Sequence, residues 1–192
     1  MPASHGRHRS PFAARSFWTG LHLCVAAFLA PVVLLMAISG GLYLFGIKGK
    51  VVEIPVDLAP NATLDLAAAD LEMAVRQLLA DAGIEHRFEY LKREDGTLTT
   101  RPTSRAYYVL RVEQDGVRAA RNEPDVQKRL IELHKGHGPT AFKTLQKILA
   151  VGLLVIVGTG FWLGLSAVGL RFRMAAISGV GLLLFVLLAF VL

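Results

Sequence analysis

The sequence predicts an α-helical membrane protein with three transmembrane helices. A small α+β domain, one helix on an antiparallel sheet, is inserted between the first and the second. More than half of the 192 residues are hydrophobic, and they are concentrated in three runs that approach or exceed the roughly 20 residues that a bilayer-spanning helix needs. All fifteen acidic residues lie between Glu53 and Glu132, so the polar domain falls between the first and second runs.

The first run, residues 17–47, contains no Lys, Arg, Asp or Glu. A cleaved signal peptide is the alternative, but its apolar region is only about 7–15 residues long and ends in small residues. We therefore interpret the run as a retained anchor. Pro31 has no backbone N–H and is expected to kink this helix. The small residues Ser39-Gly40-Gly41 let another helix come close. Together with the kink they could leave room between helices for a cofactor, and close packing alone explains them equally well.

The second and third helices follow the polar domain. The apolar pattern predicts them at residues 144–168 and 174–192, joined by a turn at residues 169–173. In the second helix, Gly160 and Gly164 form a small-xxx-small pair, a frequent helix contact in lipid. The third contains no ionisable residue.

Charge predicts the orientation of the helices and excludes one class of partner. The basic residues outside the polar domain include Arg7, Arg9, Arg15, Arg171 and Arg173. Short basic segments stay on the cytoplasmic side, so the tail at residues 1–16 and the turn are expected there, and residues 48–143 on the opposite, outer side of the membrane. With Lys143 and Lys147, these flanking residues account for the net charge of +6. A nucleic-acid partner is excluded because the polar part has no basic stripe with interleaved aromatics.

Residues 48–143 show the alternating and helical patterns of one α+β unit. Asp95-Gly96 is a tight-hairpin signal, and Gly83 is placed to end a helix. The unit has no catalytic constellation, and we interpret its lone His86 as structural. The predicted elements are a strand at 51–56, a helix at 71–82, strands on both sides of Asp95-Gly96, a strand at 106–113 with Tyr108, Leu110 and Val112 on one face, a turn at Asp115-Gly116, a strand at 117–121 and a helix at 125–133.

Histidines lie where polar sequence meets apolar sequence. His22 is just inside the first span, where an ionisable residue is a functional candidate by default, although a residue near the helix end could simply bond to headgroups or water. His134 and His137 belong to the segment 133–139, just before the second span. Histidine is well suited to hold a metal or haem iron near neutral pH. The alternative is that these are ordinary polar residues in a helix-breaking junction.

Four short motifs occur in a characteristic order: Leu21-His22, Ile38-Ser39-Gly40-Gly41, Leu133-His134-x-Gly136 and Gly158-Thr159-Gly160-Phe161-Trp162. In this order the chain resembles the PepSY-associated transmembrane family of bacterial inner-membrane proteins, in a short form with a single PepSY domain. The resemblance covers residues 15–166, and residues 66–121 resemble the PepSY domain itself.

The resemblance implies a multi-pass inner-membrane protein that takes part in the reductive release of iron from siderophores, with haem b held by histidines of the spanning helices. By position, His22 would be a haem-iron ligand on the cytoplasmic side and His134 one on the periplasmic side, with His137 as a helper. The chain would then be a ferric-chelate reductase or a subunit of one. Its partners would be the lipid bilayer, a ferric siderophore, and either a membrane redox protein or a second copy of the chain.

The chain also departs from the longer members of that family, which have more spans and a further histidine at the start of a later span. Here the corresponding segment, residues 171–174, has none. His22 and His134 are predicted at opposite faces, about 30 Å apart, so each haem would need a second ligand. His137 could be the second ligand beside His134, and a homodimer would supply a symmetry-related His22. Otherwise the haem would have no second protein ligand, or this short form would lack haem altogether. The alternative function is a non-enzymatic, membrane-anchored PepSY module that senses or binds a partner protein.

Overall fold

The computed structural model describes residues 11–60 and 62–191, and the side chains from residue 15 onward within them. Arg7 and Arg9 of the predicted cytoplasmic tail lie outside the described residues. The chain divides into two compact units, Met1–Val32 with Ile148–Leu192, and Val33–Lys147. Helices α1 (Pro11–Leu44) and α4 (Thr140–Ser166) contribute to both units. The boundary in α1 falls one residue after Pro31.

Three helices are long and apolar enough to cross a membrane: Arg15–Leu44, Thr140–Ser166 and Arg171–Val191. At 1.5 Å per residue their lengths are about 30–45 Å, and the hydrocarbon core of a bilayer is about 30 Å thick. The prediction of three long apolar helices is therefore confirmed.

The ends of these helices differ from the predicted boundaries by a few residues. Helix α4 begins at Thr140, four residues before the predicted start. Helix α5 (Arg171–Val186) continues as the π-helix η1 (Leu187–Val191). The backbone N–H groups of Arg171 and Met174 already make helical bonds to the carbonyls of Ala167 and Leu170 (both 2.9 Å). The predicted turn at 169–173 is therefore largely taken up by the start of α5.

Glycines allow close helix contacts in the first unit. A Cβ on Gly152 of α4 would lie 2.2 Å from Leu29 Cδ1 of α1, and one on Gly164 would lie 2.8 Å from Met174 Cε of α5. A Cβ on Gly160 would meet His22 of α1 instead. The predicted pair Gly160 and Gly164 therefore contacts two different helices, α1 through His22 and α5 through Met174.

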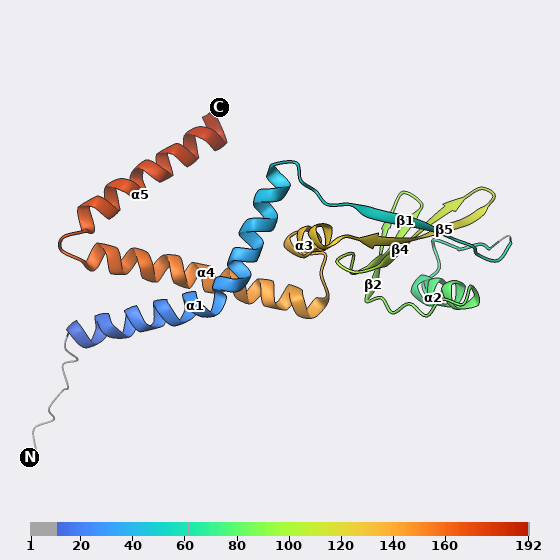
Figure 1. Cartoon of the computed structure of the whole chain (residues 1–192), viewed down its shortest axis with the longest axis horizontal. Helices are drawn as coiled ribbons and strands as arrows, with labels where there is room; N and C mark the ends of the chain where they lie inside the picture. The colour runs from blue at the N-terminus through green and yellow to red at the C-terminus, as the bar shows by residue number, and fades with distance from the viewer. Residues whose placement is uncertain (1–10, 61, 192) are drawn as a thin grey trace, which may run out of the picture. The chain divides into compact units, whose positions relative to one another are not determined.

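Seven elements of the second unit lie between α1 and α4: β1 (Val51–Val56), α2 (Leu71–Asp81), β2 (Tyr90–Glu94), β3 (Thr97–Arg101), β4 (Tyr107–Glu113), β5 (Gly116–Pro124) and α3 (Val126–His134) (Figure 1). The five strands form one antiparallel sheet with the order β1-β5-β4-β3-β2. The structure confirms the predicted helix on an antiparallel sheet.

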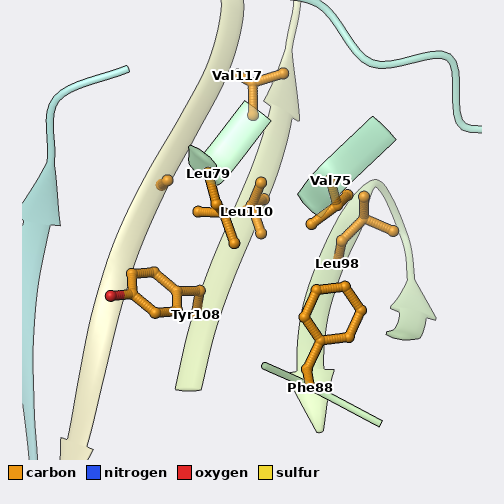
Figure 2. Close-up of a cluster of buried hydrophobic side chains, with 8 residues drawn as sticks. Val75, Leu79, Phe88, Leu98, Tyr108, Leu110 and Val117 are labelled. Atoms are coloured by element: carbon orange, nitrogen blue, oxygen red, sulfur yellow. The ribbon is translucent and has the colours of Figure 1, made fainter. Parts of the chain in front are cut away.

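The core of this unit lies between α2 and one face of the sheet (Figure 2). Val75 and Leu79 of α2 are four residues apart, so both point to the sheet, and both are buried. Burying an aliphatic or aromatic side chain of this size stabilises a fold by about 1.5–3 kcal/mol. Tyr108 and Leu110, predicted on one face of a strand with Val112, lie in this core, and Val112 packs against it. The buried cluster consists of Val75, Leu79, Phe88, Leu98, Tyr108, Leu110, Val117 and Ala119.

Helix α3 carries His134 at its last position and is fixed at both ends. Asp125 is its N-cap, and its carboxylate accepts hydrogen bonds from the backbone N–H groups of Lys128 (2.7 Å) and Lys50 (2.8 Å). At the other end, Gln146 Nε2 of α4 donates to the Leu133 carbonyl (2.9 Å). Bonds from Lys50, the residue before β1, and from Gln146 of α4 therefore hold the helix that carries His134.

Candidate functional site

The imidazole of His22 lies against α4 in the first unit. Its Nδ1 is 2.9 Å from the Oγ1 of Thr159, and Thr159 is buried. The next residue of α4 is Gly160, where a Cβ would lie only 3.2 Å from the Cε1 of His22. A glycine at position 160 therefore lets the ring approach α4 closely enough to meet the hydroxyl of Thr159.

An apolar cavity of about 400 Å³ shares Thr159 with this histidine. Its volume lies within the roughly 300–1,000 Å³ of small-molecule and cofactor sites. The rings of Trp18 and Trp162 line it, with centroids 5.8 Å apart and planes at 54°. Such walls suit a large, flat, mostly apolar ligand. The lining residues are Trp18, Val155, Gly158, Thr159 and Trp162.

In the second unit, the imidazole of His134 lies against the last turns of α1. Its Nδ1 is 3.4 Å from the Oγ of Ser39, which is almost fully buried and donates to the Met36 carbonyl (3.1 Å). A Cβ on Gly40 would lie 2.9 Å from the Cε1 of His134 and 3.4 Å from its Nε2. Here too a glycine is needed for the ring to lie where it does.

His134 also lines a cavity, of about 460 Å³, between α3 and the end of α1. The cavity is walled mainly by apolar side chains and by the backbone of the small residues of α1. Its polar groups are few, as in typical cofactor sites. The lining residues are Met36, Ala37, Ser39, Gly40, Gly41, Tyr43, Leu44, Ile131, His134 and Lys135.

The two histidine sites share one local design. Each imidazole turns its Nδ1 toward a side-chain hydroxyl, and the residue after that hydroxyl is a glycine whose missing Cβ makes room for the ring. The pairs are Thr159-Gly160 for His22 and Ser39-Gly40 for His134. The sequence identified these residues as small or as parts of motifs, but not as partners of the histidines.

His137, the third candidate ligand, makes a different contact. Its Nδ1 is 2.7 Å from the Oε2 of Glu132, and its backbone carbonyl accepts from the Thr103 N–H (3.2 Å). It is thus held by α3 and by the loop after β3, whereas His134 lies against α1. The imidazole of His137 contacts Glu132, whereas that of His134 contacts Ser39. In this structure His137 therefore helps to anchor α3.

Glu132 is the centre of a buried polar network beside the His134 site. Its Oε2 accepts from Thr103 Oγ1 (2.7 Å), and its Oε1 is 3.3 Å from Lys128 Nζ. Burial raises the pKa of the Glu132 carboxyl, but the hydrogen bonds from Thr103, His137 and Lys128 outweigh it and lower that pKa to about 2. The carboxylate is therefore charged at neutral pH and holds α3 to the sheet domain.

His86 of the sheet domain belongs to the fold. Its Nε2 is 3.0 Å from Thr100 Oγ1, and its ring lies 4.6 Å from Tyr108 and 6.0 Å from Phe88 (centroid distances). Burial lowers the pKa of His86, and nearby arginines lower it further. These contacts agree with its interpretation as a structural residue.

Within residues 11–60 and 62–191, no three His, Cys, Asp or Glu side chains gather as they would around a metal ion. His134 lines the cavity beside it, whereas His22 contacts Thr159, which lines the other cavity. Comparison of the chain with protein-family models, curated proteins and solved structures finds no match.

Proposed function

We propose that this chain is a haem-b electron-transfer protein of the bacterial inner membrane, acting as a ferric-chelate reductase or as a subunit of one. His22 and His134 would be the axial ligands, the first near the cytoplasmic face and the second near the periplasmic face. The substrate would be a ferric siderophore in the periplasm. The observation that carries the proposal is the repeated arrangement of a histidine, a hydroxyl and a glycine, each beside an apolar cavity.

The residues at both sites fit a haem in its chemical requirements. Haem iron takes an imidazole nitrogen as axial ligand, and a ligating histidine almost always uses its other ring nitrogen for a hydrogen bond that fixes the ring. Here Nδ1 meets Thr159 or Ser39, which leaves Nε2 for iron. The tryptophans at the first cavity and the aliphatic side chains at the second would make apolar contacts with a porphyrin.

Bound haem would supply a one-electron carrier, and this chain's own residues would hold it. Each site has one imidazole that would hold the haem, and any further protein ligand would come from a group beyond the site, such as His22 of a second copy. The proposed periplasmic location of the sheet domain and the proposed cytoplasmic N-terminus are supported by the basic residues of the tail and by Arg171 and Arg173 in the first turn of α5.

The test is the visible spectrum of full-length protein purified from haem-replete membranes. Wild type is expected to show a Soret band. His22→Ala and His134→Ala are each expected to remove about half of the bound haem, since each removes the protein ligand at one site, and the double variant all of it. His86→Ala is the control, because that residue lies in the sheet domain. A colourless wild type would refute the proposal.

A second candidate function is a membrane-anchored module that binds or senses a partner protein. The observation in its favour is the edge strand β1, whose Val52 and Ile54 are 60% and 42% exposed. An exposed apolar edge strand can accept a further strand from a partner. This candidate predicts that wild-type protein is folded and colourless. It also predicts that His22→Ala and His134→Ala have the same visible spectrum as wild type.

A further inference from the structure

The hydroxyl of Thr159 has three polar neighbours. Its Oγ1 is 2.6 Å from the Val155 carbonyl oxygen, 3.2 Å from that of Ile156 and 2.9 Å from the Nδ1 of His22. A threonine hydroxyl has one proton to donate and two lone pairs to accept with. The three contacts therefore fix where each proton lies.

The shortest contact decides the direction of the bonds. Two oxygens only 2.6 Å apart attract each other when a proton lies between them, and that length is typical of an O–H···O bond. A carbonyl has no proton, so the hydroxyl of Thr159 donates to Val155. Its oxygen can then meet the Nδ1 of His22 only as an acceptor, and Nδ1 must carry the proton.

A neutral imidazole has one N–H and one bare nitrogen. If Nδ1 of His22 carries the proton, Nε2 has the free lone pair that a metal ligand needs. We propose that Thr159 is a positioning residue that holds His22 in the Nδ1–H tautomer and so presents Nε2 as the ligating atom. The identity of the ligated group, haem iron, rests on the proposed function; the tautomer does not.

The other histidine site has the same direction of bonding with longer contacts. Ser39 Oγ donates to the Met36 carbonyl at 3.1 Å and is 3.4 Å from the Nδ1 of His134. A hydrogen bond to the second ring nitrogen fixes the ring and raises its basicity as a ligand. The shorter bond at Thr159 therefore fixes His22 more strongly than Ser39 fixes His134.

The tautomer is measured by nitrogen NMR of full-length protein, labelled with 15N-histidine, in lipid nanodiscs at a pH where the imidazoles are neutral. The His22 signals are assigned by their loss in His22→Gln. We expect wild-type His22 with a protonated Nδ1 and a bare Nε2. Thr159→Val removes the acceptor at nearly constant volume and should increase the Nε2–H form several-fold, and Thr159→Ser should restore the wild-type pattern.

The matched control is Thr144→Val. Thr144 lies on the same helix and also donates to the carbonyl four residues earlier (3.2 Å), and its hydroxyl contacts no histidine in the described structure. This variant should leave the His22 signals unchanged. The proposal would be overturned if His22 of the wild-type protein had the Nε2–H tautomer. It would also be overturned if His22 had the same tautomer in Thr159→Val as in wild type.

Haem binding gives a second readout. In a His134→Ala background, where only the His22 site remains, Thr159→Val should weaken haem affinity by about 10-fold or more, as loss of an outer-shell partner typically does. Thr159→Ser should keep it. Unchanged affinity in Thr159→Val would overturn the positioning role. If wild type has the Nδ1–H tautomer but binds no haem, the tautomer assignment stands and the proposed function fails.

Discussion

Replacing Glu132 with glutamine is expected to lower the free energy of unfolding of the sheet domain by roughly 3 kcal/mol at neutral pH. The carboxylate is buried, and Thr103, His137 and Lys128 depend on it for their bonds. The depression of its pKa from 4.5 to about 2 corresponds to that free energy, because one pKa unit is about 1.4 kcal/mol. Thermal unfolding of full-length protein in detergent should show a Tm about 10 °C or more below wild type.

The effect of this substitution depends on pH in a defined direction. The pKa of Glu132 is lower in the folded state than in the unfolded chain, so ionisation of this group stabilises the fold fully above about pH 4.5. The stabilisation is lost as pH falls from there to about 2. The difference in Tm between wild type and Glu132→Gln should therefore shrink over that range. A difference that stays constant would show that the charge of Glu132 is not what stabilises the domain.

Glu123→Gln is the matched control for Glu132. Its carboxylate pairs with Arg121 at 2.6 Å, and the two side chains are 40% and 46% exposed, far more than that of Glu132. Ion pairs of this kind contribute about 0–1 kcal/mol. The control variant should unfold within a few degrees of wild type, and its Tm difference should show little pH dependence.

Local patterns in the sequence were sufficient to predict most elements of the sheet domain. Asp95 and Gly96 both have positive φ angles (39° and 76°), as a two-residue hairpin turn requires. Helix α2, predicted at residues 71–82, ends at Asp81, one residue before its predicted end. The second hairpin was less accurate: it turns at Gln114-Asp115, and Gly116 already pairs with Glu113 as the first residue of β5. An Asp-Gly pair marks a turn, but not which residues occupy its two central positions.

The pairing of β1 with β5 could not be predicted, because it joins segments more than sixty residues apart. Val51 pairs with Pro124 and Val56 with Ala119, and no local motif specifies such a register. The same limit applies to the candidate site. His22 and His134 were identified as ionisable residues at the edges of apolar runs, but their partners Thr159 and Ser39 lie 137 and 95 residues away. His137 was grouped with His134 by proximity in sequence, whereas its imidazole bonds to Glu132.

Gly40→Ala is expected to reduce haem binding at the His134 site by about 10-fold or more, the usual cost of disturbing a ligand's support. The new Cβ would lie 2.9 Å from the Cε1 of His134, so the imidazole must leave its place beside Ser39. Gly160→Ala should act in the same direction and less strongly on His22, because its Cβ would lie 3.2 Å from that ring. Each is measured by haem titration in a background that lacks the other histidine.

Two other helix glycines provide the controls for both substitutions. Gly20 lies on α1 and Gly179 on α5; a Cβ at either position would have no neighbouring atom within 4 Å, and neither residue lines one of the two cavities. All four changes replace glycine by alanine inside a helix, which by itself favours the helix by about 0.5–1 kcal/mol. A loss of haem confined to Gly40→Ala and Gly160→Ala would therefore come from displaced imidazoles and not from unfolding. Equal loss of haem in all four variants, or in none, would show that haem binding does not depend on the positions of the two imidazoles, and would contradict the candidate sites.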